Sequence, residues 1–151
     1  MANTQAMCTS FKGELLVGHH NFGTGVTRGS TAADSFKAAL YLASATVNAA
    51  TTAYSASDEV SGTGYTAGGV AVTFGTPPST SGTTAFVTPS ASISYSSVTL
   101  STAFDCVLIY NSTQSNKAVS VHTFGSQTVT AGTFTLTMPT NDASTGLIRL
   151  A

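Results

Sequence analysis

The feature that most constrains the fold is a regular alternation of apolar residues with Ser or Thr in the second half of the chain. The alternating runs are Gly69–Gly75, Thr84–Thr88, Ala91–Ser96, Val98–Leu100, Ala118–Phe124, Gln127–Val129, Thr133–Met138 and Leu147–Leu150. Successive side chains of a β-strand point to opposite faces, so each run places its apolar side chains on one face. The pattern predicts half-buried strands that share a core.

Two further segments read as strands. Phe104–Tyr110 is apolar nearly throughout, which predicts a central strand covered on both faces. Ser35–Leu42 is also a candidate strand, although its Ala-Ala-Leu centre permits a helix. Residues 49–59 could hold a single helical turn. Turn signals separate the later strands at Asn111–Asn116, Gly125–Ser126, Ala131–Gly132 and Pro139–Gly146.

Eight to ten short strands with frequent turns indicate an all-β, antiparallel β-sandwich or barrel, and we favour a jelly-roll-like sandwich of two sheets. A chain of 151 residues fits one domain with one core. We expect the sandwich to span residues 36–151. The predicted core residues are Phe36, Leu40, Val72, Phe86, Ile93, Val107, Ile109, Val119, Phe134 and Leu136.

Residues 1–35 differ from the rest because they hold one short apolar run and end in a glycine-rich stretch. They read as an extended N-terminal arm, a contact element outside the sandwich core that is mobile in isolation. We expect the arm to bind a partner, chiefly between Phe11 and Phe22. The candidate contact residues are Phe11, Leu15, Leu16, Val17 and Phe22.

The shortage of charge bears on function. Only 11 residues are charged, whereas Ser, Thr, Ala and Gly make up 82 of the 151. A surface of hydroxyls, backbone amides and small apolar groups suits packing against other proteins better than catalysis. Long strand edges without Lys or Glu invite pairing with another chain, which favours a protein whose edges are covered in an assembly.

Several partner classes are disfavoured. The five basic residues are scattered along the chain and the net charge is −1, so we expect no nucleic-acid binding. No run approaches the 18 apolar residues of a membrane span, so we expect no membrane partner. The N-terminus lacks the basic and apolar regions of a signal peptide, which favours synthesis in the cytoplasm. In that setting Cys8 and Cys106 are expected to be buried thiols.

Candidate catalytic and metal sites are weak. His19, His20 and His122 lack acidic or thiol partners at ligand spacing, which indicates no metal site. A Ser-His-Asp set of some serine with His122 and Asp105 has no Gly-x-Ser-x-Gly elbow to support it. We therefore expect no catalytic residues, no cofactor and no enzymatic activity.

Two loop segments carry residues that could bind a ligand. Asp58 and Glu59 could bind a cation, but a solvated turn is the favoured interpretation. The glycine-rich loop at residues 62–69 lacks the Lys-Ser/Thr ending of a phosphate-binding loop, so it is not expected to bind a nucleotide.

Several motifs, in order along the chain, resemble small virion structural proteins of tailed bacteriophages. The motifs are Phe36–Tyr41, Ala53–Gly69, Leu108–Val119 and Phe134–Thr140. The resemblance covers about residues 36–151 and is greatest to head decoration, or cement, proteins. It implies a jelly-roll-like fold on the outside of the capsid, with the major capsid protein and other copies of the chain, as a dimer or trimer, as partners.

Two other classes stay open. One is a tail, neck or fibre component of the same virion, which would share composition and fold. The other is a carbohydrate-binding sandwich, because aromatic rings can stack on sugars. The candidate platforms are Tyr41, Tyr54, Tyr65, Tyr95 and Tyr110. The absence of Trp and the few carboxylates weigh against sugar binding.

Overall fold

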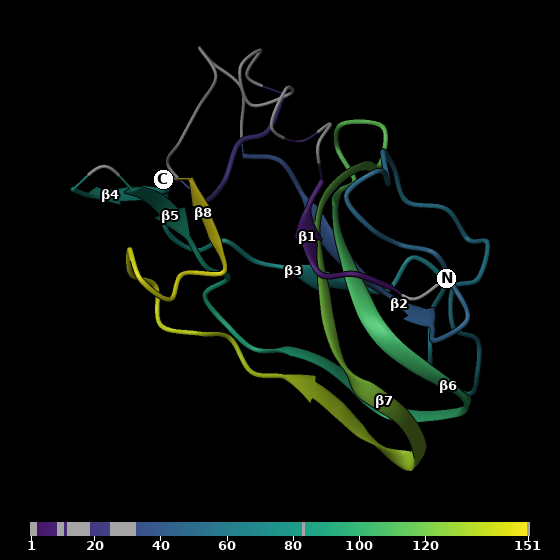
Figure 1. Ribbon diagram of the computed structural model, residues 1–151. Coiled ribbons are helices and arrows are strands. Elements are labelled where there is room, and N and C mark those ends of the chain that lie inside the picture. Colours follow the sequence, from purple (N-terminus) through teal and green to yellow (C-terminus); the bar gives the residue numbers. More distant parts are fainter. Residues whose placement is uncertain (1–2, 9–10, 12–18, 25–32, 83, 151) are drawn as a thin grey trace.

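The computed structural model describes residues 3–8, 11, 19–24, 33–82 and 84–150 (Figure 1). These residues form eight strands, all paired antiparallel, which confirms the predicted all-β, antiparallel fold. The strands are β1 (Ala6–Met7), β2 (Phe36–Leu42), β3 (Val70–Val72), β4 (Ser79–Ser81), β5 (Thr84–Val87), β6 (Ile93–Asn111), β7 (Lys117–Leu136) and β8 (Ile148–Leu150).

The larger sheet has the strand order β1-β7-β6-β2-β3, and β6 lies at its centre. Every residue from Phe104 to Asn111 except Asp105 is buried, so the prediction of a central strand covered on both faces is confirmed. The strand reading of residues 35–42 is also confirmed, because β2 pairs with β6 along its whole length. The helical turn considered for residues 49–59 is wrong, since this segment consists of turns and isolated bridges.

The strands β6 and β7 form one long ribbon in place of the six short strands that the sequence predicts there. Ser97 and Ala131 take left-handed backbone angles, with φ of 54° and 45°, near the Val98–Gly132 pair, and the register shifts repeatedly around them. Such bulges bend a ribbon without ending it. The turns predicted at Gly125–Ser126 and Ala131–Gly132 are therefore wrong, because both pairs lie within β7.

The bend folds the ribbon back on itself and makes a second layer. Phe134 packs edge-on against Phe104, with ring centroids 5.0 Å apart, although the two residues are not paired in the register. Ile93 and Leu136 line a cavity of about 130 Å³ together with Val107. We call Cys106–Asn111 with Lys117–Thr123 the proximal ribbon, and Ile93–Leu100 with Val129–Leu136 the distal ribbon.

The smaller sheet, with the order β4-β5-β8, lies beside the larger one (Figure 1). Val87 of β5 and Ile148 of β8 belong to the common core. The connections between the two sheets do not establish a jelly roll, so that part of the fold stays a prediction. Of the ten predicted core residues, eight are buried, and Phe134 and Leu136 are half-buried at the edge of the core.

The described part of the N-terminal segment belongs to the folded domain. Phe11 is fully buried and Phe22 is 5% exposed, and Phe22 stacks on Phe36 with centroids 4.9 Å apart. β1 adds a strand to the larger sheet by pairing with β7. The expectation that Phe11 and Phe22 stand outside the core is therefore wrong. Aromatic side chains bury large apolar areas, so two widely spaced rings can anchor a segment that lacks a strand pattern.

Candidate interaction surface

Among the described residues, β7 has a long stretch that pairs with another strand on one side only. β1 pairs with β7 only at Ser120 and Val121, and the Cys8 amide donates to the Val119 carbonyl beyond them. From residue 123 to residue 136, the only strand that pairs with β7 among the described residues is β6. We call residues 123–136 of β7 the open edge. Unpaired strand edges present rows of N–H and C=O groups to other chains.

The open edge carries no charged side chain, and the next charged residue along the chain is Asp142. Thr133 and Thr135 are exposed, whereas Phe134 and Leu136 between them are half-buried. Threonine suits a pleated surface and can hydrogen-bond across strands. The edge thus lacks the charges with which strand edges commonly discourage pairing.

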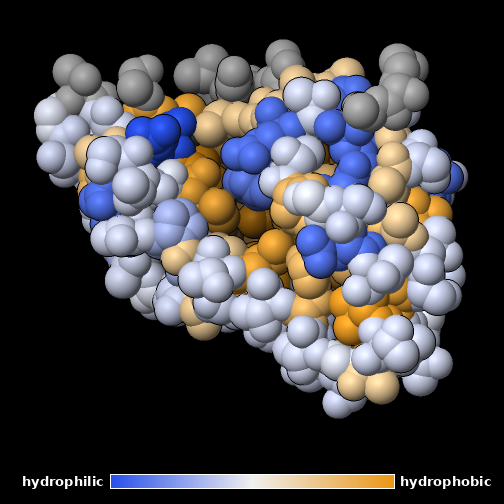
Figure 2. Space-filling model, turned by 60° about the horizontal axis from the view of Figure 1, so that its bottom comes forward, coloured by the Kyte–Doolittle hydropathy of each residue, from blue (hydrophilic) through white to orange (hydrophobic). Residues whose placement is uncertain are grey.

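The edge strands of the two sheets, β1, β3, β4 and β8, have two or three residues each. β4 is fully exposed and pairs only with β5, but it has three residues. β3 pairs only with β2 and also has three residues. On the face drawn in Figure 2, most of the surface has intermediate hydropathy, strongly hydrophilic residues lie in separate patches, and apolar residues line a hollow between them.

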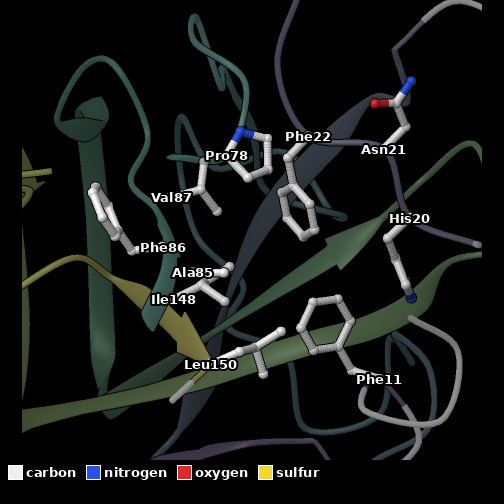
Figure 3. A pocket seen from close by; sticks show the side chains of 10 residues that line it. All are labelled: Phe11, His20, Asn21, Phe22, Pro78, Ala85, Phe86, Val87, Ile148 and Leu150. Atoms are coloured by element: carbon white, nitrogen blue, oxygen red, sulfur yellow. The ribbon is translucent and has the colours of Figure 1, made fainter. Parts of the chain in front are cut away.

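An apolar pocket of about 220 Å³ lies between the N-terminal segment and the smaller sheet (Figure 3). Phe11 and Phe22 face Ile148 and Leu150 across it. Leu150 is 40% exposed, unlike the other large hydrophobic residues described. Of the candidate arm residues, Phe11 and Phe22 thus meet at one pocket, and Leu15, Leu16 and Val17 lie outside the described residues.

Glu59 lies at the centre of a tyrosine cluster. Its carboxylate accepts hydrogen bonds from the hydroxyls of Tyr54 (2.7 Å) and Tyr65 (2.6 Å) and from the Gly68 amide (2.8 Å). The Tyr65 hydroxyl also accepts a bond from the Leu40 amide of β2. The interpretation of Glu59 as part of a solvated turn is therefore wrong. This carboxylate fastens the glycine-rich loop to the sheet.

Close backbone approach explains the glycines of that loop. A Cβ on Gly62 would collide with the Thr99 carbonyl of β6, and one on Gly69, whose φ is +72°, would collide with the Ala38 carbonyl of β2. Only glycine fits such positions without strain. The loop at residues 62–69 thus covers part of the second edge of the distal ribbon and leaves β7 as its exposed side.

The tyrosines do not form a row of exposed rings. Tyr41, Tyr95 and Tyr110 are buried, and Tyr54 stacks on Tyr110 with centroids 4.7 Å apart. Burial raises the pKa of the Tyr41 hydroxyl to about 12, while burial and then the hydrogen bond to Glu59 raise the pKa of Tyr65 further. These phenols stay protonated near neutral pH and donate to acceptors within the protein. Their arrangement therefore does not support stacking on a sugar.

The residues considered for a catalytic triad make separate contacts. The hydroxyl of Ser120 lies 2.9 Å from His122 Nε2, and burial lowers the pKa of His122 to about 4. The Asp105 carboxylate accepts a hydrogen bond from the Asn3 amide. Ser120 is only 3% exposed. His122 thus contacts a buried serine, whereas Asp105 binds a different partner, Asn3.

The two cysteines are fully buried and are not joined by a disulfide, as predicted. Burial and then the charge of Asp105 raise the pKa of the Cys106 thiol to about 12. Such a thiol has little thiolate character near neutral pH. Its role is to fill space in the core.

No three His, Cys, Asp or Glu side chains within residues 3–8, 11, 19–24, 33–82 and 84–150 are grouped in a way that could hold a metal ion. The same part of the chain contains no helix long and apolar enough to cross a membrane.

Comparison with known proteins identifies no relative. No protein-family model, no curated protein and no solved structure matches this chain.

Proposed function

We propose that this chain is a non-enzymatic structural protein of a tailed-bacteriophage virion, which binds the outside of the head as a decoration, or cement, protein. In this role each copy contacts the major capsid protein and other copies, and bridges neighbouring capsid subunits. The protein is made in the host cytoplasm and acts on the capsid surface. The resemblance of residues 36–151 to such proteins gives the setting.

The observation that carries the proposal is the uncharged open edge of β7. Fourteen residues of strand, from 123 to 136, present backbone groups without a charged side chain. An extended segment can add to such an edge, so that main-chain hydrogen bonds supply affinity. When the protein is alone, this long edge of β7 is uncovered. An assembly that covers the edge best explains why the protein has it.

Repetition on a lattice strengthens weak contacts. Many identical copies bound to one capsid raise the effective concentration of each next contact, without further chemistry. Because the contacts are apolar and hydrogen-bonded, attachment is insensitive to salt, whereas exposed ion pairs weaken as the Debye length shrinks. Each attached copy then resists the outward pressure of packaged DNA by holding neighbouring subunits together.

The experiment uses heads assembled without this chain, to which the purified protein is added. We expect full occupancy from low salt to about 1 M salt, where the Debye length is about 3 Å. Charge reversal of the exposed Lys37, by Lys37→Glu, should leave occupancy unchanged. Loss of the protein at moderate salt would show that its few charges carry the binding.

The cementing role has its own measurement. Heads with the protein should release DNA at a higher temperature than heads without it. Release at one temperature for both would contradict cementing. Labelling of the bound protein in electron micrographs separates head attachment from the alternative, a tail, neck or fibre component, since label confined to the tail would favour that class.

A further inference from the structure

The end of the open edge, together with the residue that follows it, has a sequence that can pair with itself. Residues 133–137 read Thr-Phe-Thr-Leu-Thr, which is symmetric about Thr135 apart from the exchange of Phe134 and Leu136. In an antiparallel pair of two identical strands, a two-fold axis at Thr135 places Thr133 opposite Thr137 of the second copy. It also places Phe134 opposite Leu136 of the second copy.

The two faces of such a pair would match. Thr133, Thr135 and Thr137 are exposed and would form three neighbouring threonine pairs on the outer face. Phe134 and Leu136 are half-buried and would continue the apolar inner row from one copy into the next. Threonine pairs and apolar pairs directly across an antiparallel sheet are each stabilising.

Charge favours a second copy as the occupant. A two-fold axis brings each side chain near the axis close to its own counterpart, so any charge there would face a like charge. The open edge has no charge from residue 123 to residue 136, and none follows before Asp142. With the axis at Thr135, residues 134–136 of β7 in one copy lie opposite residues 136–134 of the other, and Thr133 and Thr137 extend the pair by one residue at each end.

We propose that two copies of the chain associate through the open edge of β7, antiparallel and about a two-fold axis at Thr135. The dimer then has a continuous sheet that runs from β6 and β7 of one copy to β7 and β6 of the other. This inference rests on the proposed function for its setting and names the surface between copies. It is tested on purified protein alone, so its failure is distinguishable from a failure of head binding.

The register predicts which cysteine substitutions cross-link. Residues directly opposite in an antiparallel pair have Cα atoms about 4.5–5.5 Å apart, within the range of a disulfide. Thr135→Cys should therefore form a covalent dimer with oxidised glutathione. Thr133→Cys alone should not, since its counterpart lies about 13 Å away along the strand. The double variant Thr133→Cys/Thr137→Cys should cross-link again.

The native cysteines give a clean background, because Cys8 and Cys106 are both buried. The unmodified chain treated in the same way is the blank. Cross-linking of Thr133→Cys as efficiently as Thr135→Cys would overturn the register. Absence of any covalent dimer with Thr135→Cys, in a variant whose far-ultraviolet circular dichroism matches that of the parent, would overturn the proposal.

A charge at the axis provides the second test, by sedimentation velocity over a concentration series. Thr135→Lys places two ammonium groups across the axis and should weaken dimerisation by about tenfold or more at low salt. Ser94→Lys is the matched control, because Ser94 pairs with Thr135 on the adjacent strand and is also exposed. Its two copies would lie about 14 Å apart, beyond the Debye length at physiological salt.

The expected result is a dimer for the parent chain and for Ser94→Lys, and a monomer for Thr135→Lys that dimerises again at high salt. A parent chain that stays monomeric at its highest soluble concentration would overturn the proposal. A Thr135→Lys variant that dimerises as tightly as the parent would also overturn it, because the interface would then lie elsewhere.

Discussion

The proximal and distal ribbons belong to the same pair of strands but have opposite surroundings. In the proximal ribbon, β2 covers the outer edge of β6, β1 covers part of β7, and the residues from Cys106 to Asn111 are buried. In the distal ribbon, a glycine-rich loop covers part of β6, and β7 has an open edge. Exposed Thr and Ser alternate there with apolar residues.

This difference shows how one ribbon of two strands, β6 and β7, can supply both core residues and a contact surface. A continuous apolar run needs cover on two faces and two edges, and the proximal ribbon receives it within the chain. A run of alternating Thr and apolar residues needs cover on one face only. The bend at Ser97 and Ala131 provides that face by folding the distal ribbon back, and leaves its edge for a partner.

The largest expected effect on stability comes from shortening a leucine side chain, and its size should differ between the two ribbons. Leu108→Ala removes a fully buried side chain from the proximal ribbon and should lower the free energy of unfolding by about 2–5 kcal/mol. Leu136→Ala acts on a half-buried side chain of the distal ribbon and should cost less than about 2 kcal/mol. Urea unfolding measures both. Equal losses would remove the distinction between core and edge.

His122 lies where the proximal ribbon ends, and its titration should make stability depend on pH. Its pKa is lowered from 6.5 to about 4 by burial, so the unfolded chain binds the proton more readily. The stabilisation is therefore complete above pH 6.5 and is lost as the pH falls toward 4, by up to about 3 kcal/mol. Hydrogen bonds from Ser144 and Thr145 lower the pKa of Asp142 from its ordinary value of 3.8. The stability that this carboxylate contributes is therefore lost at pH values below 3.8, outside this window.

The measurement is unfolding by urea at a series of pH values for the parent chain and for His122→Gln. The variant should lose most of the pH dependence between pH 6.5 and 4. A slope that persists unchanged in His122→Gln would assign the titration to another group.

A smaller effect tests the loop that protects one edge of the distal ribbon. Tyr65→Phe removes a hydroxyl that binds both Glu59 and the Leu40 amide, and should cost about 1–3 kcal/mol. Tyr54→Phe is the control, since that hydroxyl donates to Glu59, and it should cost less. Thermal unfolding compares them. A larger loss for Tyr54→Phe would contradict the anchoring role of Tyr65.

The smallest effect on folding is expected at the open edge. Thr135→Lys changes an exposed residue and should alter the free energy of unfolding of the monomer by no more than about 0.5 kcal/mol. Urea unfolding at low protein concentration measures this change. A loss of several kcal/mol would place Thr135 in the fold of the single chain and not at a contact surface.

The sequence predicts the fold class and the most buried strand because both follow from local patterns. The apolar run at residues 104–110 and the turn at residues 111–116 need no knowledge of distant contacts. The merging of short strands into one ribbon could not be predicted, since Ala131 takes a left-handed angle that its residue type does not favour. Local patterns thus located the strands but misplaced their ends.

The buried contacts of Phe11, Phe22 and Glu59 were also missed, for a related reason. Phe22 is buried by Phe36 and Phe74, which lie 14 and 52 positions later in the chain. The Glu59 cluster joins the loop to β2 through Tyr65. Such contacts arise when distant segments meet, and a single sequence carries no periodic signal for them. The uncharged edge, in contrast, could be anticipated from composition alone.

Amide hydrogen exchange on the dilute free protein and on the protein bound to heads tests the central claim most directly. The account predicts that binding slows exchange in residues 123–136, the open edge of β7. Residues 106–111 should exchange slowly in both states, because they are already buried in the free chain. Unchanged exchange along the open edge, with new protection confined to other segments, would contradict the assignment of the distal ribbon as the contact surface.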